Sequence, residues 1–316
     1  MNESYLPEGM LQDRPENREA LSCKAALERA MLTGRILEAT ALLCDNRLRL
    51  HVDLGCMRGY IEREEAVFCR PGEQIKDIAV ITRVGKPVAF KILRFEQEGD
   101  ATVAILSRRA AQAECVERFL SYLSPGDVIP ARVTHLENYG AFVDIGCGIA
   151  SLLSIDCISV SRITHPRERL ACGMYIRVAV KSIDRALGRY FVTQKELLGT
   201  WEQNAARFEP GETVMGRVRS IESYGIFVEL TPNLSGLAEL RGNQGTPVKS
   251  AVGDLAAVFI KSILPERMKI KLVIIDSRPE PERPEPPQYF IPSDCRHLDY
   301  WEYSPACCGR LIETVF

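Results

Sequence analysis

The sequence lacks long apolar runs and carries almost no excess of charge of one sign. No run approaches the ~18 apolar residues of a membrane-spanning helix, so we expect no membrane partner. Residues 1–19 are mainly polar and include several acids, a pattern typical of neither a secretory signal nor an Arg-rich transit peptide. Because the formal net charge is -2, a bulk positive field alone could not hold a nucleic acid.

Motifs for catalysis and metal binding are also scarce. The sequence has neither a phosphate-binding Gly-Lys-Ser/Thr loop nor a His-x-x-x-His pair, so we expect no enzyme, no catalytic residue and no cofactor. The 11 cysteines are an odd number without a framework spacing, which favours a reducing, cytoplasmic setting. The last part of the chain contains four zinc-type ligands at a spacing unusual for a zinc finger: Cys295, His297, Cys307 and Cys308. We expect reduced surface or packing cysteines there rather than a metal site.

The sequence does contain an internal repeat. Residues 139–145 read Tyr-Gly-Ala-Phe-Val-Asp-Ile, and residues 224–230 read Tyr-Gly-Ile-Phe-Val-Glu-Leu. Both copies follow an Arg-Val pair and a Pro-Gly-acid start. A weaker copy at 48–55 keeps the strand pattern but lacks both aromatic residues. The spacing of the copies is that of whole domains and exceeds the 20–50 residues of a solenoid repeat.

Hydrophobic alternation predicts short strands in each repeat, for example over 128–136, 175–183 and 190–193. Four or five strands in ~75 residues suit a small closed barrel. Apolar residues at helical spacing predict helical connectors near 111–119 and 195–208, and a helix over 21–32. A proline-rich acidic segment then predicts an extended linker, and the aromatic tail after it either docks on a partner or folds back on a barrel.

The aromatic residues of the repeat indicate a surface for unpaired bases. A bulge or turn at Gly140 would bring Tyr139 and Phe142 to the same outer face of a strand. Stacking contributes roughly 1–3 kcal/mol per base and tolerates any sequence. Cations that could contact the phosphates are Arg177, Lys181 and Arg189. The alternative that residue type leaves open is that both aromatics pack in the barrel core.

These motifs resemble the RNA-binding repeat named after the bacterial small-subunit ribosomal protein S-one. The resemblance rests on Arg-Val-x-x-Leu-x-x-Tyr-Gly-Ala-Phe-Val-Asp-Ile-Gly at 132–146 and Gly-Arg-Val-x-x-Ile-x-x-Tyr-Gly-Ile-Phe-Val-Glu-Leu at 216–230. It covers about 125–275 well and about 33–110 weakly. It implies a mainly β chain with connecting helices and tandem five-stranded oligonucleotide-binding (OB) barrels.

The resemblance also implies which residues form the ligand face, which in this family uses two aromatics, a His, an Asp and an Arg. The middle repeat supplies Tyr139 and Phe142, with Asp184 and Arg189 at the Asp and Arg positions and Ser154 in place of the His.

In the third repeat, Tyr224 and Phe227 are the aromatics, Lys269 replaces the Arg, and Glu239 stands at the His position. Weaker RNA binding is expected there, because a carboxylate faces the phosphates. The first repeat resembles the degenerate leading repeats of the ribosomal protein, which serve protein contact more than RNA.

Pattern and resemblance together divide the chain into eight segments: an N-terminal helical lead (1–32), a degenerate barrel (33–110), a helical connector (111–124), a barrel (125–194), a helical connector (195–209), a barrel (210–275), a Pro-rich acidic linker (276–288) and an aromatic tail (289–316).

The sequence therefore predicts a cytoplasmic protein that binds single-stranded RNA, with mRNA in translation as its target and the small ribosomal subunit as a partner. One alternative is a protein-interaction scaffold, on the ribosome or an RNA-processing complex, with weak RNA binding. Another is an accessory subunit of a ribonuclease complex whose catalytic part is a separate chain.

Overall fold

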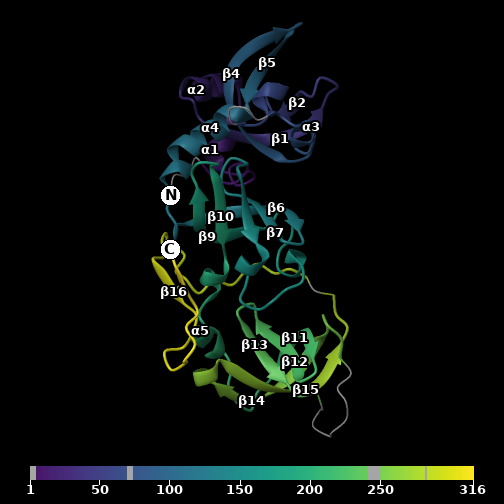
Figure 1. Cartoon of the computed structure of the whole chain (residues 1–316). Helices are drawn as coiled ribbons and strands as arrows, with labels where there is room; N and C mark the ends of the chain where they lie inside the picture. The colour runs from purple at the N-terminus through teal and green to yellow at the C-terminus, as the bar shows by residue number, and fades with distance from the viewer. Residues whose placement is uncertain (1–4, 70–73, 241–249, 282) are drawn as a thin grey trace. The chain divides into compact units, whose positions relative to one another are not determined.

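Three closed five-stranded barrels follow one another along the chain. The structure is a computed structural model that describes residues 5–69, 74–240, 250–281 and 283–316 (Figure 1). It contains two compact units. One consists of Met1–Leu123, Pro130–Arg132 and Asp144–Ala150, and the other of Ser124–Ile129, Val133–Val143 and Ser151–Phe316.

The first barrel has the strand order β1-β2-β3-β5-β4, with β3 parallel to β5. Its strands are β1 (Leu37–Cys44), β2 (Leu50–Asp53), β3 (Arg58–Ile61), β4 (Pro87–Glu98) and β5 (Ala101–Ser107). The helices are α1 (Pro15–Leu21), α2 (Lys24–Leu32), α3 (Asp77–Ile81) and α4 (Arg108–Arg118), with 3-10 turns η1 (Arg63–Glu65) and η2 (Leu120–Tyr122).

The middle and third barrels repeat this order, and each again has one parallel strand pair, β8 with β10 and β13 with β15. The middle strands are β6 (Val128–Glu137), β7 (Gly140–Asp144), β8 (Ala150–Ser154), β9 (Tyr175–Asp184) and β10 (Arg189–Thr193), with η3 (Ile155–Cys157) and η4 (Pro166–Glu168) between them. The third strands are β11 (Thr213–Glu222), β12 (Gly225–Thr231), β13 (Leu234–Ala238), β14 (Leu255–Leu264) and β15 (Lys269–Arg278), with η6 (Pro265–Arg267) between the last two.

The alternation that predicted strands also determines which side chains fill the barrels. In β12, Ile226 and Val228 are buried in the core of the third barrel, whereas Phe227 between them is only half-buried. The outward residues of each strand are therefore left for other contacts. The predicted fold class, mainly β with connecting helices and tandem five-stranded OB barrels, is confirmed.

The connector expected near 111–119 is the helix α4, but the two other expected helices are shorter than the spacing predicted. The segment expected to be helical near 195–208 consists of η5 (Lys195–Leu198) and α5 (Trp201–Ala205). Gly199 interrupts it with φ 86°, and the Thr200 hydroxyl caps α5 by accepting a hydrogen bond from the Gln203 amide at 3.2 Å. Similarly, the helix expected over 21–32 is α2 alone, because α1 ends at Leu21.

The aromatic tail folds back within the second unit, which decides between the two alternatives that the sequence left open (Figure 1). Its only regular elements in the described chain are the paired strands β16 (Tyr300–Glu302) and β17 (Glu313–Val315). The Trp201 amide donates to the Tyr303 carbonyl at 3.0 Å, and the Tyr303 hydroxyl donates to the Asn233 carbonyl at 2.6 Å. Tyr289 and Phe316 pack against Val128 of the middle barrel.

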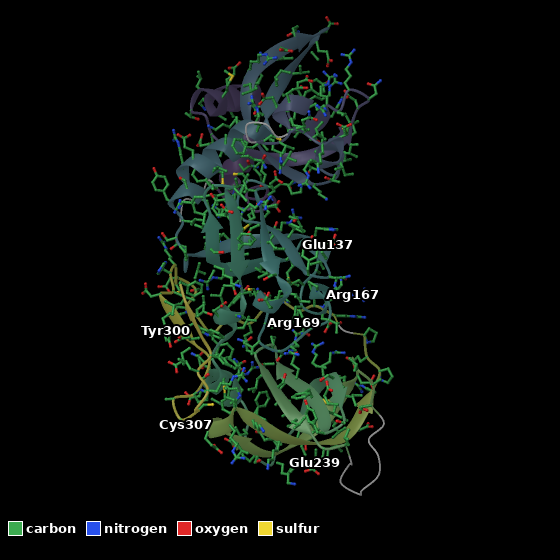
Figure 2. The ribbon with its side chains drawn as sticks, viewed as in Figure 1. Glu137, Arg167, Arg169, Glu239, Tyr300 and Cys307 are labelled. Carbon is green, nitrogen blue, oxygen red and sulfur yellow. The ribbon has the colours of Figure 1, made fainter. Side chains whose placement is uncertain are left out.

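A buried cluster of charges, here called the joint, links the middle and third barrels inside the second unit. Its members are Glu168, Arg169, Arg219 and Glu229, and Figure 2 labels Arg169 among them. Arg219 donates from Nη1 to Glu168 at 2.6 Å and from Nε to Glu229 at 2.8 Å. Arg169 also donates to Glu229. Beside them the Ser161 amide donates to the Pro232 carbonyl at 3.0 Å, so main-chain contacts reinforce the charged ones.

We expect Gly140→Ala to destabilise the protein. A Cβ at this position would lie 2.5 Å from the Leu153 carbonyl oxygen, a backbone atom that cannot move aside by changing a rotamer. The expected loss is about 1–3 kcal/mol in the free energy of unfolding, measured by urea denaturation. Gly309→Ala is the control, because nothing lies within 4 Å of its Cβ position. Equal midpoints for the two variants would contradict this expectation.

We expect Glu168→Gln to lower the free energy of unfolding at neutral pH more than at acidic pH. Burial alone would raise the pKa of Glu168, but hydrogen bonds from Thr164 and the charge of Arg219 lower it. Because the pKa of Glu168 is lower in the folded state, its ionised carboxylate stabilises the fold at pH values above the ordinary carboxyl pKa. This stabilisation is lost as the pH falls through the pKa of the folded state. Glu168→Gln should therefore cost roughly 1–3 kcal/mol at neutral pH, and its deficit from wild type should shrink below about pH 4.

Urea unfolding at several pH values measures this difference, with the exposed Glu222→Gln as the control. A deficit that stays constant with pH would show that the Glu168 charge contributes nothing to the joint.

Candidate nucleic-acid interface

The middle barrel presents two aromatic rings on its outer face, here called the middle pair. Tyr139 lies just before β7 and is 56% exposed, and Phe142 is half-buried within β7. Their ring centroids are 6.2 Å apart with an interplanar angle of 88°. The neighbouring Ala141 and Val143 point into the core. Tyr139 and Phe142 thus have an edge-to-face geometry with open ring surface.

The third barrel repeats this geometry with Tyr224 and Phe227, here called the third pair. Tyr224 is 67% exposed, and the two centroids are 6.1 Å apart at 88°. The hairpin between β11 and β12 explains the placement. Glu222 is in register with Gly225, so Tyr224 lies in the tight turn while Phe227 occupies an outward strand position. A Cβ at Gly225 would lie only 2.8 Å from the Ala238 carbonyl oxygen, so the glycine lets β12 and β13 come together below the pair.

Sequence reasoning missed two outward-facing aromatic side chains of the middle barrel. His135 in β6 is exposed and stacks on Phe142 with centroids 6.4 Å apart. Phe191 is outward and in register with Leu152, between the buried Tyr190 and Val192. The outward position of Phe191 could have been predicted from the alternation of residues 189–193, because a strand residue between two inward-facing ones faces outward.

The predicted polar residues of the middle repeat lie at the ends of β8, β9 and β10. Lys181 donates to the Cys157 sulfur at 3.1 Å, and this hydrogen bond raises the pKa of Lys181, so the lysine stays charged. Arg189 is exposed and in register with Asp184, whose carboxylate accepts the Leu187 amide and closes the turn. The Ser154 hydroxyl donates to Asp156 at 2.6 Å.

Arg177 is placed differently from the other predicted cations. Its guanidinium donates to the carbonyl oxygens of Pro292 at 3.0 Å and Cys295 at 2.7 Å, and it lies 5.8 Å from the Tyr289 ring centroid. The structure therefore brings Arg177 to the tail and not to the middle pair. Its main role in the described chain is to hold the tail on β9.

The charge around the third pair is mixed. Glu239, which stands where the family has a His, is exposed and forms a surface ion pair with Lys261 at 3.5 Å (Figure 2). Lys269 is exposed at the start of β15, and Lys271 lies in register with Leu237, which itself neighbours Phe227. The carboxylate of Glu239 is thus partly compensated.

The first barrel has an aromatic contact on its outer face that the weak repeat did not predict. His51 and Tyr60 meet edge to face with centroids 4.7 Å apart. The Arg49 guanidinium lies 4.4 Å from the Tyr60 ring centroid, and the Tyr60 hydroxyl donates to Glu98 at 2.8 Å. Tyr60 is only 3% exposed, so side chains of the barrel itself cover the ring that a base would need.

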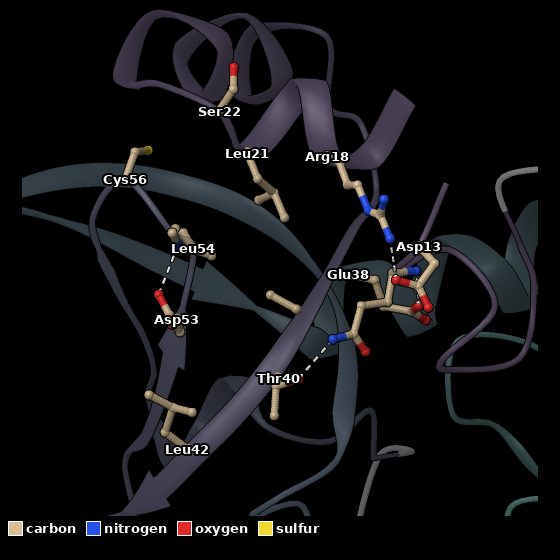
Figure 3. A pocket seen from close by; sticks show the side chains of 13 residues that line it. Asp13, Arg18, Leu21, Ser22, Glu38, Thr40, Leu42, Asp53, Leu54 and Cys56 are labelled. Atoms are coloured by element: carbon tan, nitrogen blue, oxygen red, sulfur yellow. Dashed lines mark hydrogen bonds and ion pairs between the residues drawn. The ribbon is translucent and has the colours of Figure 1, made fainter. Parts of the chain in front are cut away.

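A groove of about 720 Å³ beside α1 and β1 has the wrong charge for phosphates (Figure 3). Its carboxylates are Asp13, Glu38 and Asp53, and the one cation that lines it, Arg18, donates to Asp13 at 2.7 Å. Burial raises the pKa of Glu38 to about 7, yet the two aspartates still outnumber the arginine. This groove is therefore a poor site for RNA.

The zinc-type ligands of the tail do not converge. Across the described ranges, no three His, Cys, Asp or Glu side chains are placed to hold a metal ion. His297 instead contacts Asp127 at 2.7 Å, which raises the pKa of the imidazole, and Cys295 donates weakly to the His297 carbonyl.

None of the helices in the described part of the chain has the length and apolar character needed to cross a membrane.

Comparisons with known proteins agree with this geometry. The family model of the S1 RNA binding domain, which is the S-one repeat, matches residues 122–195. The chain is 30% identical over 241 residues to the small ribosomal subunit protein bS1 homolog of Bacillus subtilis, covering 74% of this chain and 58% of the relative. It is 34% identical over 231 residues to bS1 of Rhodopseudomonas palustris, covering 72% of this chain and 38% of that protein. The chain thus spans less than two thirds of either relative.

A solved structure of a multidomain protein with nucleic acid binding domains from Streptococcus pneumoniae is 12% identical, with a TM-score of 0.24, over 77% of this chain and 74% of that one. This score is too low to bear on the architecture, which rests on the strand order of the barrels. Family model and relatives lead to one assignment: the chain contains an S1 RNA-binding domain at residues 122–195 and has distant similarity, about 30% identity, to ribosomal protein bS1 over much of its length.

Proposed function

We propose that this protein binds single-stranded RNA by stacking bases on the middle and third pairs. The duplicated geometry carries the proposal: two exposed edge-to-face pairs, with centroids 6.2 and 6.1 Å apart, stand at equivalent positions of two barrels. An aromatic ring on a small barrel stacks an unpaired base without selecting its sequence. In a duplex the base faces are already covered, so the same pairs favour single strands.

The charges of the two barrels favour different affinities for RNA. Lys181 and Arg189 are the proposed phosphate contacts of the middle barrel, whereas the third barrel has Glu239 at the family His position, where it pairs with Lys261 at 3.5 Å. The middle barrel is therefore the stronger site. The residues proposed to contact RNA are Tyr139, Phe142, Ser154, Lys181, Asp184, Arg189, Tyr224, Phe227 and Lys269. Two modest sites within one compact unit raise the overall affinity through effective concentration.

The finer biological role extends the same proposal. The relatives are small ribosomal subunit proteins, so we place this chain in the cytoplasm with mRNA as its target and the small ribosomal subunit as its partner. The S1-domain family is generally non-enzymatic, and the chain is proposed to act by binding, without catalysis or a cofactor.

We expect Phe142→Ala combined with Phe227→Ala to lose most of the affinity for unstructured single-stranded RNA. Each lost stacking surface costs about 1–3 kcal/mol. Fluorescence anisotropy at two salt concentrations measures the affinity, with single-stranded DNA and duplex RNA for comparison. Tyr122→Ala is the matched control, because this aromatic is 80% exposed but lies outside both pairs. Unchanged RNA affinity in the double variant would favour the scaffold alternative.

The translational role has its own test. Wild-type protein should co-sediment with purified small ribosomal subunits and bring labelled mRNA with it, while the double Phe variant should bring less mRNA. RNA binding that persists in solution without any co-sedimentation would leave the RNA function intact and remove the ribosome from the proposal.

A further inference from the structure

A groove next to the third pair contains residues from outside the barrel. It has a volume of about 580 Å³, within the range of small-ligand sites. Its walls come from four places in the second unit: the loop after β8, α5, the third barrel and the tail loop at 308–310. Phe227 belongs to both the groove and the third pair. A strand stacked on the pair would therefore continue into the groove.

We propose that the tail loop completes the RNA site of the third barrel, with Arg310 binding a backbone phosphate of the nucleotide that enters this groove. The inference rests on the proposed function and deepens it, because it names a contact that the barrel alone does not provide.

The rim of the groove suits a phosphate. Arg267 comes from the turn between β14 and β15, Lys269 from the start of β15 and Arg310 from the tail, against the single carboxylate of Glu266. All three cations are exposed, and within the described ranges none of them forms an ion pair with a carboxylate. Their charges are thus available to a ligand, whereas other surface arginines, such as Arg278, already pair with acids.

The floor of the groove suits a base or sugar. Trp201 and Tyr303 are buried below it, and Met268 and Phe227 are half-buried in its wall. Ser161 and Ser235, whose hydroxyls lie 2.8 Å apart, add polar groups on the same lining. A nucleotide has an apolar base that fits the floor and a charged phosphate that fits the cationic rim. A purely acidic partner would fit only the rim, and a purely apolar partner only the floor.

The tail loop is held firmly enough to present Arg310. The loop is closed by β16 and β17, where Trp301 is in register with Thr314. Further in, the Tyr303 amide donates to the Ile312 carbonyl at 2.9 Å, and the Ile312 amide donates to the Ser304 hydroxyl at 2.8 Å. The hydrogen bond from the Tyr303 hydroxyl to Asn233 then connects the loop to the third barrel.

The consequence concerns the Glu239 position. A barrel with Glu239 in place of the family His has a weakened phosphate contact on one side of the third pair. Arg310 and Arg267 supply positive charge on the groove side. The third barrel thus recovers RNA affinity through a segment that follows it in the chain.

The first experiment compares Arg310→Ala with Arg296→Ala in the full chain carrying Phe142→Ala, so that the third barrel provides the measured binding. Arg296 is an exposed tail arginine outside the groove and is the matched control. We expect Arg310→Ala to weaken binding of an unstructured single-stranded RNA by roughly three- to tenfold and to reduce the slope of log K against log salt by about 0.7. Arg310→Lys should keep the slope. Equal slopes for Arg310→Ala and Arg296→Ala would overturn the inference.

A second measurement uses the free thiols of the tail loop and does not depend on a variant. Cys308 is half-buried in the lining of the groove, and Cys307 is exposed beside it (Figure 2). Bound RNA should slow the alkylation of Cys308 relative to Cys307, as read by mass spectrometry. Equal protection of the two, with RNA bound, would place the strand elsewhere.

The two proposals fail differently. If the groove is not used, Phe227→Ala still loses binding while Arg310→Ala and Cys308 reactivity show no specific effect. If the stacking proposal itself is wrong, Phe142→Ala and Phe227→Ala leave RNA affinity unchanged, and the groove inference falls with it.

Discussion

The joint around Arg219 is the interaction on which the arrangement of the middle and third barrels depends. One guanidinium contacts carboxylates from two barrels, Glu168 and Glu229, and little of any of the three side chains reaches water. Charges removed from water are costly unless each is compensated, so the members of the cluster hold one another in place. A hydrophobic contact would tolerate sliding, whereas a multiply bonded guanidinium requires one arrangement. The joint therefore fixes how the middle and third barrels, and with them the two aromatic pairs, are held relative to each other.

Because the net charge is slightly negative, attraction between the whole protein and RNA is weak. The proposed RNA affinity must then come from short-range contacts with ring faces and a few cations. The two barrels differ in the side chains that can provide these contacts. In the middle barrel His135 stacks on Phe142, and Phe191 faces outward in register with Leu152. The third barrel has a similar pair of rings but fewer charges of its own, and the chain after it contributes a cationic loop.

Strand alternation predicted the barrels from local sequence, but it left open whether the aromatic rings were exposed or packed in the core, and the resemblance to the S-one repeat favoured the outer face. In the structure Phe142 and Phe227 are half-buried on the outer face, because their neighbours along each strand fill the core. Contacts between distant segments could not be predicted in this way. Arg177 looked like a cation for RNA, but its position on β9 meets the tail more than a hundred residues later. The contact of the Arg49 guanidinium with the Tyr60 ring likewise forms only when the barrel closes, and no sequence motif predicts it.

The tail also imposes an order on folding during synthesis. Trp301 and Tyr303 belong to the same apolar core as Trp201 and Val218 of the third barrel, although they are made after it. When the last strand of this barrel has left the ribosome, Trp301 and Tyr303 have not yet been added, so the apolar residues that they will cover are still exposed. At roughly 5–20 residues per second, that apolar surface stays exposed for about a second or more before the tail can cover it. During this interval the nascent third barrel exposes apolar surface through which it can associate wrongly with other chains.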